Sequence, residues 1–409
     1  MSGTLSTDLS ALSSKQLVSV VNTLLEQYGE EAARLVERKV KTLKRCWILS
    51  LPHGLISTLL TSWIPLKDVV RLDSAFCNQK LRKEYTDLLQ HECIYPTPTE
   101  RECNHPKFLW WMLERRVQLR AITLRGMDRS LSAYVGSLGQ ALQCVDLTAC
   151  GVTDSFVSEL VSACPNLRSV CLARCDALTH SALELLGMRS LQSLDLSYSV
   201  AHTQAVGVSL QVSCQDLQYL NLDCHTCLSD SDIKHITRNC PSLRTLSLNH
   251  CTTLTLPAFA DIGNCPHLHV LSLNHCNVTD EALACLAGPD LRHLSLASCP
   301  LITDAAFCAL LQATQLTYFD ASHNTHISSV HSIASHWPHL QTLALNGCSA
   351  VTVEGVVSII KLCAELRELK LYLFSPAYDN AVRHALYTGK YWLGAWEDRK
   401  LVIYQTTSI

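Results

Sequence analysis

Cysteine and histidine are the residues of this chain best suited to chemistry, because its 409 residues include 21 cysteines and 18 histidines. Thiolates and imidazoles are the ligands that zinc favours, and they also serve as nucleophiles and bases. The densest grouping, His91, Cys93, Cys103 and His105, has the spacing H-x-C-x9-C-x-H. A zinc cluster is the alternative here, but no common short zinc motif has this spacing. We therefore predict no metal site.

A second grouping, Cys224 and Cys227, has the C-x-x-C spacing of redox and zinc motifs. It falls on a turn of the repeat described below, which favours a packing role. The sequence contains no phosphate-binding G-x-x-x-x-G-K-[ST] loop, no dinucleotide-type glycine pattern and no G-x-S-x-G. We predict that the chain is not an enzyme and uses no cofactor.

Many of the cysteines belong to a repeated pattern, L-x-x-L-x-L-x-x-C, as in Leu243 to Cys251 and Leu268 to Cys276. A single unit is too short to bury its apolar face, whereas stacked copies bury it continuously. The pattern occurs eleven times at intervals of 23 to 26 residues, starting at Leu119, Leu142, Leu167, Leu191, Leu217, Leu243, Leu268, Leu291, Leu316, Leu340 and Leu366. This regularity predicts a solenoid.

The second half of each unit has the features of a helix. An apolar residue and a Thr or Ser follow the cysteine, often with an Asp next, as in Thr153-Asp154 and Ser229-Asp230. The hydroxyl caps free N–H groups and the carboxylate suits the positive end of the helix dipole. Several helical stretches end in Cys-Pro, as at Cys240-Pro241, where proline stops the helix. The pattern predicts parallel strands on a concave face and helices on a convex face.

These units resemble the cysteine-containing subtype of leucine-rich repeats, with its C-P-x-L-x-x-L-x-L-x-x-C pattern. The resemblance covers residues 118–374 and implies an α/β fold, a leucine-rich repeat solenoid or horseshoe. The chain departs from the pattern at the terminal cysteine position of five units, which hold Met127, Ser199, His225, Asn324 and Phe374. Among these, His225 puts the local regularity most in doubt.

Eleven cysteines occupy fixed places in the repeat, where a free thiol packs as a small hydrophobic group. Six take the terminal position and five end helices: Cys150, Cys175, Cys251, Cys276, Cys299 and Cys348; Cys164, Cys214, Cys240, Cys265 and Cys363. Because packing explains them, disulfides are not needed, and we predict a reducing compartment, the cytoplasm or the nucleus.

Composition excludes several other classes of protein. With 48% apolar and 17% charged residues, the chain is typical of globular proteins. Its net charge is −3 and it has no sustained basic run, so nucleic acid is not expected as a partner. No run of 18 apolar residues predicts a membrane span, and residues 1–14 lack the features of a signal peptide.

A second motif precedes the repeats, within residues 49–92. It consists of Leu51-Pro52, Leu55, Ile64-Pro65-Leu66, Asp68-Val69-Val70, Leu72 and Cys77. The stretch resembles an F-box, the helical module that docks substrate receptors onto the adaptor subunit of SCF-type cullin–RING ubiquitin ligases. The resemblance assigns adaptor binding to these residues: Leu51, Pro52, Leu55, Ile64, Pro65, Leu66, Val69 and Leu72. Asp73, Asn78 and Gln79 depart from the family pattern.

The order of the two motifs is that of the F-box and leucine-rich repeat protein family. Membership implies a substrate-recognition subunit that presents a target protein to the ligase. Two alternatives remain open: the degenerate F-box-like module is only a helical cap of the solenoid, and the chain is a leucine-rich repeat scaffold without a ligase link.

Three further segments complete the predicted organisation. Residues 1–48 form an N-terminal helical segment with an amphipathic pattern, for packing, oligomer contact or regulation. Residues 93–117 form a linker and N-terminal cap with a dense apolar helix at 108–113. Residues 375–409 form a C-terminal cap, in which 392–396 and 400–404 flank a polar turn typical of a hairpin. The alternatives are a partner-binding aromatic patch in the N-terminal cap and a substrate contact in the C-terminal cap.

The outward positions of the repeat strands are the predicted target-binding surface, because they mix hydrogen-bonding groups with tyrosines. The candidate residues are Asp195, Tyr198, Tyr219, Asn221, Asp223, Asn249, His250, Asn274, His275, Tyr318, Asp320 and His323. His250 and His275 are expected on adjacent strands, about 4.8 Å apart. Their mutual repulsion when protonated predicts pH-dependent binding near 6.5, and the alternative is simple duplication of one repeat.

Overall fold

The computed structural model describes the repeats and a few residues before them. The described residues are 83, 85, 93–94, 114, 118–126, 135, 138–187, 190–199, 214–286, 290–310, 312–330, 337–363, 365–372 and 400–404. The chain divides into two compact units, Met1–Asp146 with Ser162–Asn166, and Leu147–Val161 with Leu167–Ile409. The predictions for residues 1–48 and for the F-box-like motif at 51–77 lie outside the described residues.

Two pairs of parallel strands are described in the first unit. β1 (Cys93–Ile94) pairs with β2 (Gln118–Leu119), and β3 (Ala121–Thr123) pairs with β4 (Cys144–Asp146). Sequence analysis treated 93–117 as a linker and cap and did not predict β1, because two residues show no periodicity. The apolar helix expected at 108–113 lies outside the described residues.

The second unit contains a long parallel sheet. Its strands are β5 (Ser169–Cys171), β6 (Ser193–Asp195), β7 (Tyr219–Asn221), β8 (Thr245–Ser247), β9 (Val270–Ser272), β10 (His293–Ser295), β11 (Tyr318–Asp320), β12 (Thr342–Ala344), β13 (Glu368–Tyr372) and β14 (Lys400–Tyr404). Each strand pairs in parallel with the next along the chain. Each of the eleven predicted frames supplies one strand, from β3 to β13, so the predicted repeat is confirmed.

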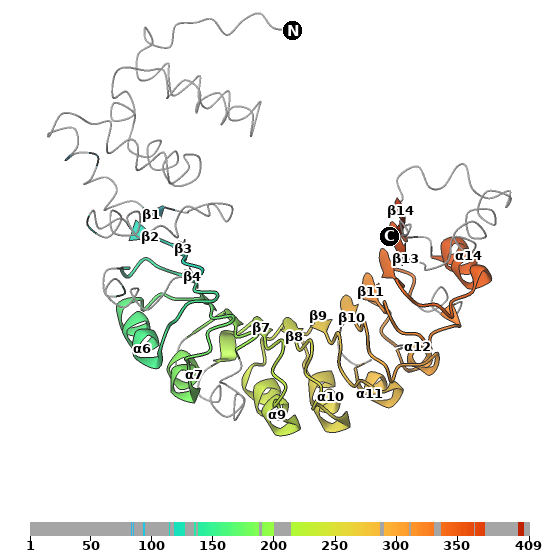
Figure 1. Cartoon of the computed structure of the whole chain (residues 1–409), viewed down its shortest axis with the longest axis horizontal. Coiled ribbons are helices and arrows are strands. Elements are labelled where there is room, and N and C mark those ends of the chain that lie inside the picture. Colours follow the sequence, from blue (N-terminus) through green and yellow to red (C-terminus); the bar gives the residue numbers. More distant parts are fainter. Residues whose placement is uncertain are drawn as a thin grey trace, which may run out of the picture. The chain divides into compact units, whose positions relative to one another are not determined.

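Helices form the other layer. They are α6 (Asp154–Ala163), α7 (His180–Gly187), the 3-10 helix η8 (Cys214–Asp216), α9 (Asp230–Asn239), α10 (Leu256–Gly263), α11 (Asp280–Cys285), α12 (Ala305–Ala309) and α14 (Val353–Leu362). Within the second unit, the strands lie along the inner side of the arc and the helices along its outer side (Figure 1). This is the predicted alternation of strand and helix.

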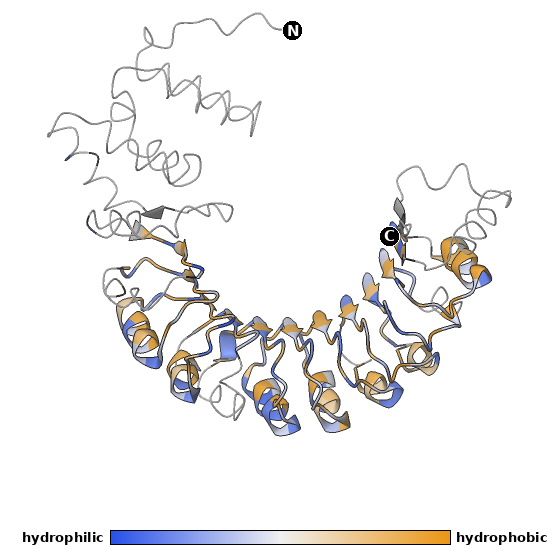
Figure 2. Cartoon of the chain, in the orientation of Figure 1, coloured by the Kyte–Doolittle hydropathy of each residue, from blue (hydrophilic) through white to orange (hydrophobic). Residues whose placement is uncertain are grey.

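Most helices begin where the Thr or Ser pattern predicted; α12 begins one residue later, after Asp304. At α9, the Ser229 hydroxyl accepts a hydrogen bond from the Asp232 backbone N–H, and the Asp232 carboxylate accepts one from the Ser229 N–H at 3.0 Å. This capping box satisfies two free donors of the helix start. Figure 2 shows α9 as a mainly hydrophilic helix with an apolar stripe, which carries the buried residues Ile233 and Ile236.

The core consists of the leucines of the repeat frame and its cysteines. All eleven cysteines assigned to packing are buried. The thiol in the terminal position donates a hydrogen bond to a carbonyl of the preceding repeat, from Cys251 to Leu222 at 3.3 Å and from Cys276 to Leu248 at 3.0 Å. Burial raises the pKa of the Cys276 thiol to about 12. Such thiols are poor nucleophiles, so their role is in packing, as predicted.

Ser199 and Asn324, two of the exceptions at the terminal position, keep this hydrogen bond with other donors. The Ser199 hydroxyl donates to the Leu172 carbonyl at 3.0 Å, and the Asn324 amide donates to the Leu296 carbonyl at 2.8 Å. His225 differs, since its Nδ1 pairs with the Leu222 carbonyl of its own repeat at 3.0 Å. Its buried Nε2 has no hydrogen-bond partner in the described part of the chain.

The buried imidazole of His225 should make stability depend on pH. Burial lowers its pKa below the ordinary value of 6.5. As pH falls below about 6.5, this imidazole therefore binds a proton in the unfolded chain but not in the folded chain. Because the unfolded chain then binds more protons, the free energy of unfolding decreases as pH decreases. The variant His225→Cys should show a smaller loss between about pH 7.5 and pH 5.5. Urea unfolding followed by circular dichroism at several pH values measures this, and equal pH slopes in both proteins would contradict it.

The C-terminal strand has an unexpected neighbour. Residues 400–404 form a strand, as predicted, but β14 pairs in parallel with β13. The expected hairpin partner at 392–396 lies outside the described residues. Because β14 continues the sheet, it covers an edge that β13 would otherwise expose.

Candidate protein-binding surface

A chain of side-chain hydrogen bonds follows the ends of the strands, and we call it the inner-face ladder. The Asp223 carboxylate accepts from the Ser247 hydroxyl at 2.7 Å, the Asn249 backbone N–H at 2.8 Å and the Asn249 side-chain amide at 3.0 Å. The Asn249 side-chain oxygen Oδ1 in turn accepts from the Ser272 hydroxyl and the Asn274 backbone N–H, both at 2.8 Å. Asn274 repeats this arrangement toward β10. Each of these side chains is thus hydrogen-bonded to the repeat that follows it.

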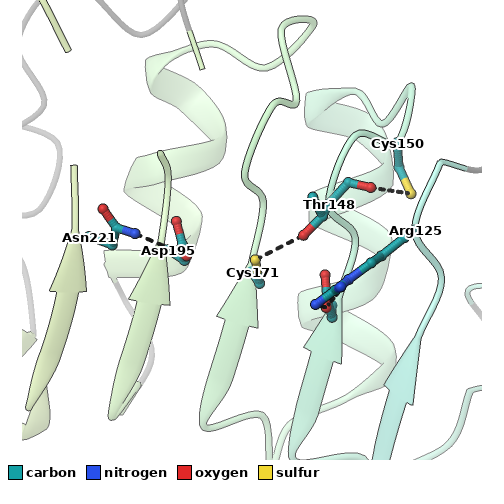
Figure 3. A network of polar contacts seen from close by, with 7 residues as sticks. Arg125, Thr148, Cys150, Cys171, Asp195 and Asn221 are labelled. Carbon is teal, nitrogen blue, oxygen red and sulfur yellow. Dashed lines mark hydrogen bonds and ion pairs between the residues drawn. The ribbon is translucent and has the colours of Figure 1, made fainter. Parts of the chain in front are cut away.

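The ladder extends toward the earlier repeats. The Asp195 carboxylate accepts from the Ser197 N–H at 2.9 Å and from the Asn221 amide at 3.2 Å (Figure 3). In the repeat before, Thr148 contacts Cys171, with 3.2 Å between Oγ1 and Sγ (Figure 3). Within the first unit, Arg125 forms an ion pair of 2.7 Å with Asp146. The contacts between successive repeats therefore differ in chemistry: amide to carboxylate, hydroxyl to thiol, and guanidinium to carboxylate.

The ladder changes the interpretation of five residues predicted to bind a target. Their side chains form hydrogen bonds within their own repeat or to a neighbouring one, and they are half-buried: Asp195, Asn221, Asp223, Asn249 and Asn274. Half-buried polar groups need such partners, because unpaired ones are costly. Asp320 similarly accepts from the Ser322 N–H at 2.9 Å. Contact of these residues with a target stays a prediction.

A second ladder joins the helix starts. The Asp154 carboxylate accepts from the Thr179 N–H at 2.8 Å and from its hydroxyl at 2.5 Å. The pairs Asp230–Thr255, Asp280–Thr303 and Asp304–Ser328 repeat this contact. Sequence analysis assigned these aspartates to helix dipoles and missed the contact between repeats. Hydrogen bonds to a carboxylate are among the stronger ones in proteins, so the helix layer is also tied together.

The third feature of this surface is a row of residues with left-handed backbone, which we call the αL row. Its members lie just before the terminal cysteine position, with φ between 57° and 65°: Ala149, Arg174, Tyr198, Cys224, His250, His275, Ser298 and His323. Gly347 holds the same place at 67°. The left-handed conformation costs a side-chain-bearing residue about 1–2 kcal/mol. Each backbone N–H donates to a carbonyl of the next repeat, as from His250 to Asn274 at 2.8 Å.

Side chains of the αL row contact one another across repeats. The His250 and His275 rings are stacked, with centroids 4.2 Å apart and 8° between their planes. Sequence analysis placed both on strands, but each strand ends three residues earlier and the pair lies in the turn. Partial burial and the neighbouring His250 and His323 lower the pKa of His275. The Arg174 guanidinium lies over the Tyr198 ring, 4.9 Å from its centroid.

Aromatic residues on the strands add to the inner face. The Tyr318 ring stacks on His293, with centroids 5.2 Å apart, and the Lys370 ammonium lies 6.0 Å from the Tyr318 centroid. Tyr219 lies on β7, and burial raises the pKa of both tyrosines. His293 and Lys370 were not predicted as site residues, although His293 is in register with Tyr318, and Lys370 is in register with Ala344 and through it with the predicted Asp320. Together with the αL row, these residues are the accessible part of the predicted surface.

In the described part of the chain, no group of three or more His, Cys, Asp or Glu residues could hold a metal ion. Of the four residues weighed for zinc, only Cys93 is described, in β1. No helix among the described segments is long and apolar enough to cross a bilayer.

The repeat pattern also matches a known family. Residues 264–287, from the end of α10 through α11, match the family described as "Leucine Rich repeat". The chain is a leucine-rich repeat protein. This agrees with the frame of eleven strands and with the buried leucines that the frame positions.

This leucine-rich repeat protein is similar in sequence to F-box/LRR-repeat protein 4 of Bos taurus. The two are 28% identical over 202 residues, which is 47% of this chain and 29% of that protein. The match thus spans less than a third of the relative's length. The distant relation agrees with the family that the motif order indicated.

Two solved structures of low sequence identity match the chain with TM-scores below 0.5. The crystal structure of the yeast Rad7 and Elc1 complex matches at 16% identity and a TM-score of 0.48, covering 98% of this chain and 100% of that chain. An internalin, InlF, from Listeria monocytogenes matches at 18% identity and a TM-score of 0.45, covering 72% and 84%.

Proposed function

We propose that this leucine-rich repeat protein is the substrate-recognition subunit of an SCF-type cullin–RING ubiquitin ligase. The observation that carries the proposal is the order of its motifs, an F-box-like stretch at 49–92 followed by the repeats at 118–374. The name of the bovine relative joins the same two modules. The chain has no catalytic role in this proposal, and the ubiquitin transfer occurs on other subunits.

The mechanism is proximity. Residues 51–72 dock the adaptor subunit, and the repeats hold the target protein on the αL row and the neighbouring tyrosines. Holding target and ligase on one scaffold raises their effective concentration, which converts a bimolecular encounter into an intramolecular one. Packing in the buried core accounts for the eleven repeat cysteines, which supports a reducing compartment such as the cytoplasm or nucleus.

Co-purification with the SCF adaptor subunit tests the proposal. The wild-type chain should retain the adaptor, and the double variant Pro52→Ala, Ile64→Asp should lose nearly all of it. A carboxylate in an apolar docking surface is not compensated by a partner charge. The measurement is the adaptor-to-chain ratio after affinity purification, with circular dichroism to verify folding.

Lys67→Ala is the matched control, because Lys67 lies between matched positions without belonging to them. It should retain the adaptor. If a folded wild-type chain does not bind the adaptor, the ligase link fails. The chain is then a protein-binding scaffold, which is the second candidate function and is favoured by the departures at Asp73, Asn78 and Gln79.

A further inference from the structure

The αL row carries side chains that its backbone does not require. Gly347 and, in the first unit, Gly126 occupy the equivalent position with φ of 67° and 69°. Glycine takes this conformation without the steric cost of a side chain. Eight other repeats nevertheless hold a strained residue, and the exposed members include Arg174, His275 and His323. Strain that is retained at exposed positions points to a role for the side chains themselves.

The chargeable side chains of the row are basic over most of its length. Arg174, His250, His275 and His323 are its basic residues, and Tyr198 and Cys224 stay neutral because their pKa values are raised. The groups that act on His275 are His250 and His323, from the neighbouring turns, and both disfavour its protonation. Ser298, the remaining member between them, is neutral. No carboxylate forms an ion pair with these four residues in the described part of the chain.

Nearby carboxylates are already engaged. Both Asp223 oxygens accept hydrogen bonds from β8 and its turn, and both Asp195 oxygens are bonded likewise. Asp320 accepts from the Ser322 N–H. The carboxylates of the inner-face ladder are therefore hydrogen-bonded to groups of the repeats, and no member of the αL row is a carboxylate.

We propose that the αL row binds an acidic, extended segment of the target protein, whose Asp and Glu side chains supply the missing carboxylates. This inference deepens the proposed function and rests on it, since it names the class of target that the repeats hold. From Arg174 to His323 the row crosses six repeat steps, about 29 Å at strand spacing, which an extended segment of about nine residues spans. Protonation of His275 adds positive charge, and because its pKa is lowered below the ordinary value of 6.5, binding tightens as pH falls below about 6.5.

The probe is a fluorescein-labelled peptide of about twelve residues with alternating Glu and Ser, long enough to span the row. Its reference is the same peptide with Gln in place of Glu. Fluorescence anisotropy with the full-length chain should show binding of the Glu peptide that is about fivefold tighter near pH 6 than near pH 7.5, because several exposed ion pairs act together. The Gln peptide should bind weakly and without this pH dependence.

The triple variant His250→Gly, His275→Gly, His323→Gly separates recognition from folding. Glycine suits all three positions, so thermal unfolding should occur at the same temperature or higher while the pH-dependent binding is lost. Ser298→Gly is the matched control, because it relieves strain in the same row and leaves the imidazoles in place. It should bind like the wild type.

Two results overturn the inference: equal affinity for the Glu and Gln peptides, or equal Glu-peptide affinity for the wild type and the triple variant. The adaptor experiment is independent of this row. If the adaptor co-purifies but the acidic peptide does not bind, the receptor function is retained and the acidic-segment inference is wrong. If the peptide binds but the adaptor does not co-purify, the acidic-segment binding is retained and the ligase link is wrong.

Discussion

Replacing Gly263 with alanine should destabilise the fold by about 3 kcal/mol, the upper range for overpacking in a closed interior. Gly263 ends α10 where it packs against α11. A Cβ at this position would lie 2.0 Å from the backbone oxygen of Cys285 and 3.0 Å from its carbonyl carbon. A backbone carbonyl cannot rotate away as a side chain does, so the two helices must separate. Urea unfolding followed by circular dichroism measures the loss.

Gly355→Ala is the matched control. A Cβ there would lie 2.8 Å from Cγ2 of Val330 and 3.3 Å from the Thr352 hydroxyl. Both are side-chain atoms, which can move by a few tenths of an ångström. The loss for Gly355→Ala should therefore be clearly smaller. Equal losses for the two variants would mean that the approach of α10 to α11 does not limit the packing of the repeats.

Trp337→Ala should cost about 3–5 kcal/mol, as expected for removal of a large buried aromatic side chain. Trp337 is 1% exposed. Its ring lies 4.9 Å from that of Phe319 and 6.2 Å from that of Phe307, and its indole N–H donates to the Leu310 carbonyl at 3.2 Å. The change leaves a cavity next to two phenylalanines that cannot collapse into it without moving their own repeats.

Trp337→Phe distinguishes packing from hydrogen bonding. It keeps an aromatic ring in the cavity and removes the donor to Leu310. Because a neutral hydrogen bond contributes about 1 kcal/mol net, the loss should be well below that of the alanine variant. Unfolding free energies from urea titrations of the three proteins decide this. A phenylalanine variant as unstable as the alanine variant would assign the stabilisation to the indole N–H instead.

The strands and helices of the repeats could be predicted because one pattern recurs. Each leucine frame yielded a strand two residues after its first leucine, and Thr153, Ser229 and Thr279 preceded helices as expected. Short or isolated elements could not be predicted in the same way. β1 has two residues, and the pairing of β14 with β13 depends on a partner far away in sequence.

The candidate surface was predicted less completely than the fold. Periodicity identified the residues on the inner side, but the roles of Asp223 and Asn249 depend on neighbours about 25 residues away, which no local pattern reveals. The αL row was missed because its residues are not those that usually indicate left-handed backbone. Gly126 and Gly347 were the only such signals at this position. The adaptor-binding residues lie outside the described part of the chain and remain predictions.

From Asp154 and Asp195 onward both side-chain ladders have a direction, whereas the Arg125–Asp146 contact of the first unit runs the other way. Thr179 donates to Asp154, Ser247 and Asn249 donate to Asp223, and in each case the acceptor lies earlier in the chain than the donor. During synthesis the earlier repeat leaves the ribosome first. Each carboxylate is therefore already in place, and solvated, when the hydroxyls and amides of the following repeat emerge. The array can grow one repeat at a time from its N-terminal side, each finished unit templating the next, without waiting for the C-terminal end of the chain.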